Sequence, residues 1–231
     1  MNNLTQSVSS FYQRSVEQLQ SFSGLGALAL RLYLAPIFII AGYNKLQLSD
    51  SSLGFFERLG ANPNVVSWFG NSEWGLGLPA PELLAFAAGW TELLGGFLLV
   101  LGLATRLVSL PLIFTMVIAA TSAHWDNGWF AIAPSNPASS AAQPLAWVGI
   151  DGAEESLENS REVGRRLTAM KSILSEHGNT DWLYDRGSVV VLNNGIEFAV
   201  TYLVMLLMLL FHGGGRFVSA DYWLARSRLA A

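Results

Sequence analysis

Two long apolar runs lie close together near the middle of the chain, and they define the predicted architecture. The runs are Leu83–Leu103 and Leu107–Ala123, with Ala104, Thr105 and Arg106 between them. Each has about 20 residues, which at about 1.5 Å per residue is enough to cross a hydrocarbon core of about 30 Å. Because the link is so short, we expect two antiparallel transmembrane helices.

Two further apolar segments bring the predicted number of membrane spans to four. The first runs from about Leu25 to Leu46, and the last from about Val189 to Phe211. A polar face at the start of the last helix would be formed by Asn193, Asn194, Glu197 and Thr201. Such a face favours a water-accessible cavity or a ligand site. The alternative is that the helix enters the membrane only at Ile196, with the asparagines outside.

The segments between these runs are polar or amphipathic. Residues 5–22 have apolar side chains at helical spacing, which predicts an amphipathic helix on the membrane surface. Hydrophobicity drops over residues 127–188, where Asp151–His177 reads as a soluble helix that begins with Asp151 and Glu154 as a capping pair. The predicted fold is therefore all-α: one membrane domain of residues 1–231, a four-helix transmembrane bundle with an N-terminal amphipathic helix. Residues 127–188 would form a helical extramembrane insertion, or cap, within it.

The composition agrees with a membrane protein and excludes several classes of site. Hydrophobic residues make up 52% of the chain and charged residues 13%, whereas soluble domains carry about 25% charge. There is no cysteine, so disulfides and thiolate metal sites are excluded, and we predict no metal. The net charge of −4 and the scattered basic residues predict no nucleic-acid binding.

The distribution of basic residues predicts the orientation in the membrane. Four spans place both termini on one side, together with Arg14, Arg106, Arg216, Arg226 and Arg228. The short loop on the other side has Lys45 and Arg58, and the long loop there is acidic overall. The excess of Lys and Arg in short cytoplasmic segments therefore predicts cytoplasmic N and C termini.

Two ionisable residues lie inside predicted spans. Glu92 is near the middle of its helix, on a face with Ala85, Gly89 and Gly96, whose small side chains allow close helix approach. A carboxylate at that depth marks a functional site by default. The alternative is that Glu92 only holds helices together through a buried ion pair. We hypothesise that its partner is Arg31 on the adjacent antiparallel helix.

Four segments together resemble the DoxX family of four-helix bacterial inner-membrane proteins. They are Arg31–Lys45 (RLYLAPIFIIAGYNK), Glu92–Arg106 (ELLGGFLLVLGLATR), His124, and Gly213–Asp221 (GGGRFVSAD). The likeness covers about residues 25–125 and 189–224, and the insertion of about 60 residues departs from it. The resemblance implies a subunit of a membrane redox complex, related to the small membrane subunit of thiosulfate:quinone oxidoreductase. It also implies a quinone and a partner redox protein, and it is compatible with a homo-oligomer in the lipid bilayer.

Two classes of function remain open at this point. In the first, the chain binds a quinone and relays electrons and protons with a partner protein. In the second, it is a non-enzymatic membrane scaffold or a small-molecule binding or transport module. Without cysteine or clustered histidine, a catalytic role would need a quinone or the partner's cofactor.

The predicted site lies in the outer half of the bundle, where three helix ends would meet at one membrane level. The candidate catalytic residues are Glu197, His124 and Glu92, and the candidate cofactor-binding residues are Lys45, Asn194, Trp90, Tyr43 and Arg31. Trp90 and Tyr43 would supply aromatic walls, and Glu197 or His124 would take protons as a quinol is oxidised. The alternative is that His124 is merely interfacial and that Glu197 pairs with Lys45. If the outer site fails, the Arg31–Glu92 region is the next candidate.

Overall fold

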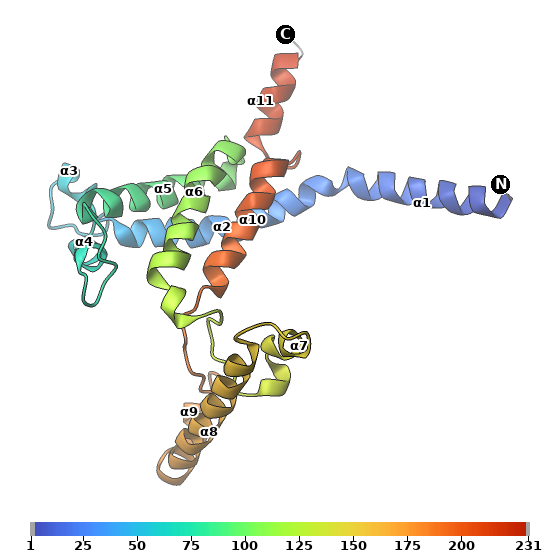
Figure 1. The fold of residues 1–231 in the computed structure, drawn as a ribbon. Helices are drawn as coiled ribbons and strands as arrows, with labels where there is room; N and C mark the ends of the chain where they lie inside the picture. Colours follow the sequence, from blue (N-terminus) through green and yellow to red (C-terminus); the bar gives the residue numbers. More distant parts are fainter. Residues whose placement is uncertain (1–2, 230–231) are drawn as a thin grey trace. The chain divides into compact units, whose positions relative to one another are not determined.

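The structure is a computed structural model that describes residues 3–229, which form helices and no β-strand. The chain divides into two compact units, one of residues 1–123 with 199–231 and one of residues 124–198 (Figure 1). The predicted all-helical class is confirmed.

The first unit contains the long apolar helices. Its helices are α1 (Asn3–Ser21), α2 (Ser23–Lys45), α3 (Phe55–Arg58), α4 (Pro63–Gly70), α5 (Pro81–Leu101), α6 (Thr105–Ile118), α10 (Glu197–His212) and α11 (Ala220–Leu229), and a π-helical turn at Ala119–Ala123 extends α6. Three segments are long and apolar enough to cross a membrane: Val8–Lys45, Pro81–Leu101 and Thr105–Ala123. With them, the chain is a multi-pass membrane protein in contact with the lipid bilayer. The helix α10 is apolar but shorter, with 16 residues.

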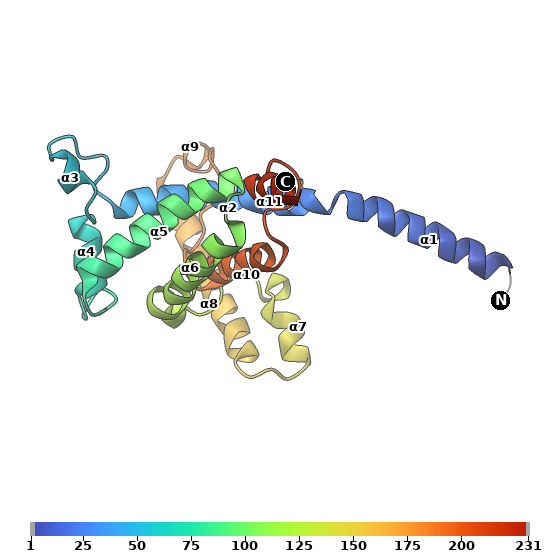
Figure 2. The same ribbon diagram turned by 90° about the horizontal axis from the view of Figure 1, so that it is seen from above.

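The helices α2 and α5 form the closest pair in this unit and lie side by side in both views (Figures 1 and 2). The helix α6 leaves the turn after α5 and runs across this pair, so the expected antiparallel hairpin is splayed. A buried cluster joins α2, α5, α6 and α10 through Leu34, Phe38, Leu99, Leu112 and Leu206, among others. Burial of these side chains stabilises the helix crossing, at about 25 cal/mol per Å² of apolar surface.

The segment after α2 folds back over the start of α5. Leu46 and Ala61 form an isolated bridge, and the N–H of Asn62 donates to the Lys45 carbonyl oxygen at 2.8 Å. In the loop, Ser52 donates to the Asp50 carboxylate from its hydroxyl and its N–H, which lowers the pKa of Asp50. The helix α4 packs on α5 around Phe69.

The second unit is helical and polar. It contains 3₁₀ turns at Trp125–Asn127 and Pro137–Ser139 and the helices α7 (Ala142–Trp147), α8 (Ala153–His177) and α9 (Thr180–Leu183). The soluble helix predicted at Asp151–His177 is thus present as α8. Its predicted capping pair is wrong, because Gly152 is the N-cap residue and no side chain caps this end.

The predicted start of the last helix at Val189 is also wrong. The helix α10 begins at Glu197. Asn194 has a positive φ of 58°, and the N–H groups of Asn193 and Asn194 both donate to the Ala131 carbonyl oxygen. These bonds pull the segment away from helical geometry, so the asparagines do not share a helix face with Glu197.

The N-terminal amphipathic helix is present as α1, whose described apolar side chains Val8, Phe11, Tyr12 and Leu19 are exposed. Its position on the membrane surface stays a prediction, as does the treatment of residues 127–188 as a cap.

Candidate functional site

Arg31 is fully buried, and in the described part of the chain its guanidinium binds only backbone carbonyl oxygens. Its Nε donates to Leu99 at 2.9 Å, its Nη1 to Gly214 at 2.6 Å, and its Nη2 to Val100 at 3.2 Å and Val218 at 2.7 Å. Leu99 and Val100 end α5, and Gly214 follows α10. The last carbonyls of a helix have no partner within it and carry partial negative charge. Arg31 therefore neutralises the C-terminus of α5 and binds it to the segment that follows α10; we call this arrangement the Arg31 clasp.

Asp221 closes the same end of the unit from the chain's C-terminal segment. Its carboxylate accepts from the N–H groups of Ala104 at 2.6 Å and Thr105 at 2.8 Å, at the start of α6. Its own N–H donates to the Gly102 carbonyl oxygen at 2.9 Å, and the Ser219 hydroxyl donates to the same oxygen at 3.1 Å. A carboxylate at a helix N-terminus is stabilising. Asp221 belongs to the segment Gly213–Asp221 that the sequence analysis named. Its hydrogen bonds could not be predicted from the sequence, because they reach the turn at Ala104, 117 residues away.

The hypothesis that Arg31 pairs with Glu92 is wrong. Glu92 pairs with Lys45, whose Nζ lies 2.5 Å from Glu92 Oε2 and 3.4 Å from the Ala41 carbonyl oxygen. The reason is depth: Arg31 is level with Leu99, and Glu92 is seven residues earlier on α5, about 10 Å along the helix. The side chain of Glu92 is 5% exposed and that of Lys45 is 23% exposed.

Small residues bring the backbones of α2 and α5 together around this pair. A Cβ added to Gly42 would meet the backbone nitrogen of Leu93 and, at 2.6 Å, the Gly89 carbonyl oxygen. A Cβ on Gly96 would lie 2.9 Å from the Ala35 carbonyl oxygen. The predicted small-residue face of α5 is confirmed, since Ala85, Gly89, Glu92 and Gly96 are all buried. This close approach is what buries the Glu92 carboxylate.

Trp90 and Tyr43, which were predicted to form aromatic walls of the site, lie on helix faces away from the Lys45–Glu92 pair. The Trp90 indole N–H donates to the Leu59 carbonyl oxygen at 3.0 Å, which fixes the loop before α4 onto α5. The Tyr43 side chain is 42% exposed. Each is two residues from a member of the Lys45–Glu92 pair, so it is about 160° away around the helix.

The other three predicted residues lie in the second unit, which includes the first two residues of α10, and they join one hydrogen-bonded loop network. His124 Nδ1 is 2.9 Å from the Asn194 carbonyl oxygen, and Glu197 Oε2 accepts from the Ala131 N–H at 2.9 Å. Asn193 Nδ2 donates to the Phe130 carbonyl oxygen at 2.7 Å. The structure thus brings His124, Asn194 and Glu197 into one network and Lys45 and Glu92 into another. The outer site that would join both sets stays a prediction.

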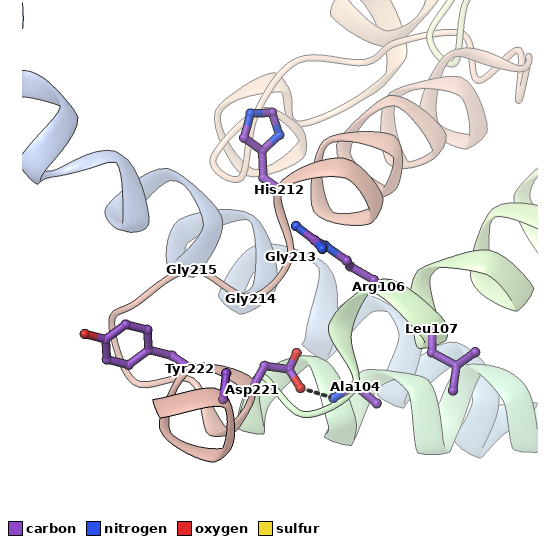
Figure 3. Close-up of a pocket in the computed structure, with 10 residues that line it drawn as sticks. Ala104, Arg106, Leu107, His212, Gly213, Gly214, Gly215, Asp221 and Tyr222 are labelled. Carbon is purple, nitrogen blue, oxygen red and sulfur yellow. Dashed lines mark hydrogen bonds between the residues drawn. The ribbon is translucent and has the colours of Figure 1, made fainter. Parts of the chain in front are cut away.

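A pocket of about 540 Å³ opens at the other end of the first unit, beside the Arg31 clasp (Figure 3). It is lined by the start of α6, the glycines that follow α10, and the first turns of α11. Sequence reasoning did not find it; the only signal was the glycine run directly after an apolar helix. Among the described residues, no group of three or more His, Asp or Glu side chains could hold a metal ion.

Comparison with known proteins gives one match. Residues 26–125 match the family model DoxX. This segment contains α2, α5 and α6, and with them both Arg31 and the Lys45–Glu92 pair. No curated protein and no solved structure matches the chain.

Proposed function

Residues 26–125 of the chain belong to the DoxX family, and on that premise we propose that the protein is an integral subunit of a redox complex in the bacterial inner membrane. In this proposal it binds a quinone and exchanges electrons and protons with a partner protein. The observation that carries the proposal is the buried Lys45–Glu92 pair inside the matched segment. Ionisable groups at membrane depth are costly and mark proton paths or substrate sites.

The side chains of this pair offer the groups that a quinone headgroup binds. Quinone sites combine apolar walls with a few polar groups directed at the ring oxygens. An ammonium has three N–H groups, and Lys45 directs them at Glu92 and, over a longer distance, at Ala41, so donor capacity remains. Lys45 is also the more exposed member of the pair, which makes it the group that a ligand would meet first.

The two residues would take different roles. A bound quinone would supply two-electron, two-proton chemistry. Lys45 would donate a hydrogen bond to a ring oxygen, and Glu92 would take a proton from the Lys45 ammonium and hold it, which leaves a neutral amine able to accept a proton in turn. The ammonium also compensates the buried carboxylate whenever Glu92 is ionised, because an unpaired buried charge is strongly destabilising.

We extend the proposal to the topology, with α10 as a fourth span and residues 127–188 as an outer cap. The helix α10 has 16 residues, about 24 Å in length, and a bilayer can thin locally to match a short span. Both termini would be cytoplasmic, since Arg14, Arg106, Arg216 and Arg226 would then share the cytoplasmic side.

Cysteine labelling tests this topology, and the chain has no native cysteine to interfere. Single cysteines at the exposed positions Ser51, Ser139 and Ser227 should react with a membrane-impermeant maleimide from outside, outside and inside, respectively. Labelling in intact cells is compared with labelling in lysed cells. External labelling at Ser227 as well as at Ser139 would contradict the fourth span, which lies between them, and internal labelling at Ser51 would contradict the orientation.

The second candidate function is a scaffold that holds partner proteins in the membrane without chemistry of its own, or a small-molecule binding or transport module. The Arg31 clasp and the bonds of Asp221 to the start of α6 favour the scaffold, because both residues bind backbone groups at helix ends. A scaffold would tolerate neutralisation of Glu92 wherever folding survives.

Exchange of Glu92 for glutamine separates the two functions. The complex that copurifies with the tagged chain is assayed for electron exchange with a short-chain quinone. Because general acid–base groups contribute about 10²–10⁴-fold, Glu92→Gln should lower the rate by about 100-fold or more. Glu82→Gln, at an exposed position on the same helix, is the matched control. Equal rates in folded Glu92→Gln and Glu82→Gln proteins would favour the scaffold.

A further inference from the structure

The pocket beside the Arg31 clasp carries an inference that is independent of the quinone proposal. Arg106 lies beside Gly213 and donates from Nη2 to the Phe211 carbonyl oxygen at 3.2 Å. Across the glycine segment, Asp221 lies beside Ala104 (Figure 3). Both side chains line the pocket, together with His212.

The two charges in this pocket do not neutralise each other. Among the described residues, no ion pair joins Arg106 to Asp221, and Arg106 has only one carbonyl as a hydrogen-bond partner. Asp221 accepts one N–H at each carboxylate oxygen, and each oxygen keeps a further lone pair. The pocket therefore presents a cation and an anion that can both take another partner.

The rest of the lining combines backbone donors with apolar surface. In the described part of the chain, the N–H groups of Gly214 and Gly215 have no hydrogen-bond partner. Gly213 and Gly215 have positive φ angles of 76° and 73°, and such glycine runs form concavities that bind anionic oxygens. Leu107 is 69% exposed on the rim, at the start of an apolar helix. The pocket thus combines a few charged and backbone polar groups with a larger apolar lining, which includes Leu107 at the start of α6.

We propose that this pocket binds the headgroup of a zwitterionic phospholipid. Arg106, His212 and the glycine N–H groups would bind the phosphate oxygens, and the Asp221 carboxylate would bind the ammonium group. The acyl chains would lie against Leu107 and the apolar helices. Planar arginine donors suit phosphate. A headgroup with a phosphate and no cation would leave Asp221 facing a second negative charge, so a zwitterionic headgroup is favoured over an anionic one.

Lipid retention by the purified protein tests the proposal. The full chain is purified in mild detergent, washed free of loose lipid and examined by native mass spectrometry with phosphatidylethanolamine or phosphatidylglycerol added. We expect phosphatidylethanolamine to bind preferentially. Arg106→Gln should weaken its binding about tenfold, as expected for loss of one charge-assisted hydrogen bond. Arg226→Gln is the control, because Arg226 is exposed, lies over Trp223 and is outside the pocket.

Three results would overturn the proposal. The first is equal binding by the Arg106→Gln and Arg226→Gln proteins. The second is equal or tighter binding of phosphatidylglycerol. The third is displacement of the lipid by millimolar inorganic phosphate or glycerophosphoethanolamine, which would make the ligand a free phosphate compound. His212→Gln, at an exposed position, provides a second variant in case Arg106→Gln fails to fold.

Discussion

Replacing Arg31 with leucine is expected to lower the free energy of unfolding by more than about 3 kcal/mol, because each buried unsatisfied acceptor costs about 1–3 kcal/mol. The substitution removes a donor from four carbonyl oxygens, those of Leu99, Val100, Gly214 and Val218. Leu99 keeps the Gly102 N–H as a donor, so in the described part of the chain three of the four are left unsatisfied. Arg31 is fully buried, so water cannot take over these bonds without opening the unit. Thermal unfolding in detergent and the monodisperse fraction after gel filtration measure the effect.

Two comparisons identify the cause of this loss. Arg161→Leu removes an arginine from the exposed face of α8, where its pair with Glu158 is solvated, and it should change the unfolding free energy by less than about 1 kcal/mol. Arg31→Lys keeps the charge but not the planar fork of donors, so it should give an intermediate loss. Equal unfolding temperatures for the Arg31→Leu and Arg161→Leu proteins would show that the Arg31 clasp contributes nothing to stability.

Glu92→Gln provides a further check on the clasp. If Arg31 bound Glu92, neutralising both would restore part of the stability. The structure instead predicts additive losses for Arg31 and Glu92, which act at different levels of α5, and a strong coupling between Lys45 and Glu92. Partial rescue of Arg31→Leu by Glu92→Gln would contradict this.

The second large effect is expected for Gly42→Ala. The added Cβ would meet the Leu93 backbone nitrogen and would lie 2.6 Å from the Gly89 carbonyl oxygen. Backbone cannot move aside as a flexible side chain can, so α2 and α5 must separate. Overpacking of this kind costs about 1–3 kcal/mol and sometimes more. Separation would also admit water or lipid to the Lys45–Glu92 pair, so quinone exchange should fall together with stability.

The matched control is Gly26→Ala on the same helix, where an added Cβ meets nothing within 4 Å. It should leave the unfolding temperature unchanged or slightly raised, since alanine favours helix over glycine by about 1 kcal/mol. Equal unfolding temperatures for the two alanine variants would show that α2 and α5 are not held together at Gly42.

Local patterns in the sequence were sufficient to predict the long apolar helices and the buried face of α5. Apolar run length predicted three of the long segments, and the spacing of Ala85, Gly89 and Gly96 predicted which face of α5 is buried. The error at the start of α10 arose because Asn193 and Asn194 bond to a segment more than 60 residues away. Helical periodicity cannot report such a bond.

The partners of the buried charges depend on helix register, which single residues do not reveal. Arg31 binds carbonyl oxygens, and every residue has one, so no residue type marks its partners. Lys45 meets Glu92 because Gly42 and Gly89 set the register between α2 and α5. A comparison of the membrane depths of Arg31 and Lys45 would have favoured Lys45 as the partner of Glu92. Lys45 and Glu92 lie toward the same end of the antiparallel pair of helices.

We propose that the Lys45–Glu92 end of this membrane protein binds a quinone, and the quinone content of the purified chain tests this most directly. The tagged protein is purified in mild detergent, extracted with organic solvent and analysed by chromatography against a membrane protein of similar size from the same cells. We predict quinone well above that control in the wild type and a loss of most of it in Lys45→Met and Glu92→Gln proteins that fold. The claim is contradicted if the wild type holds no more quinone than the control, or if both variants keep the wild-type amount.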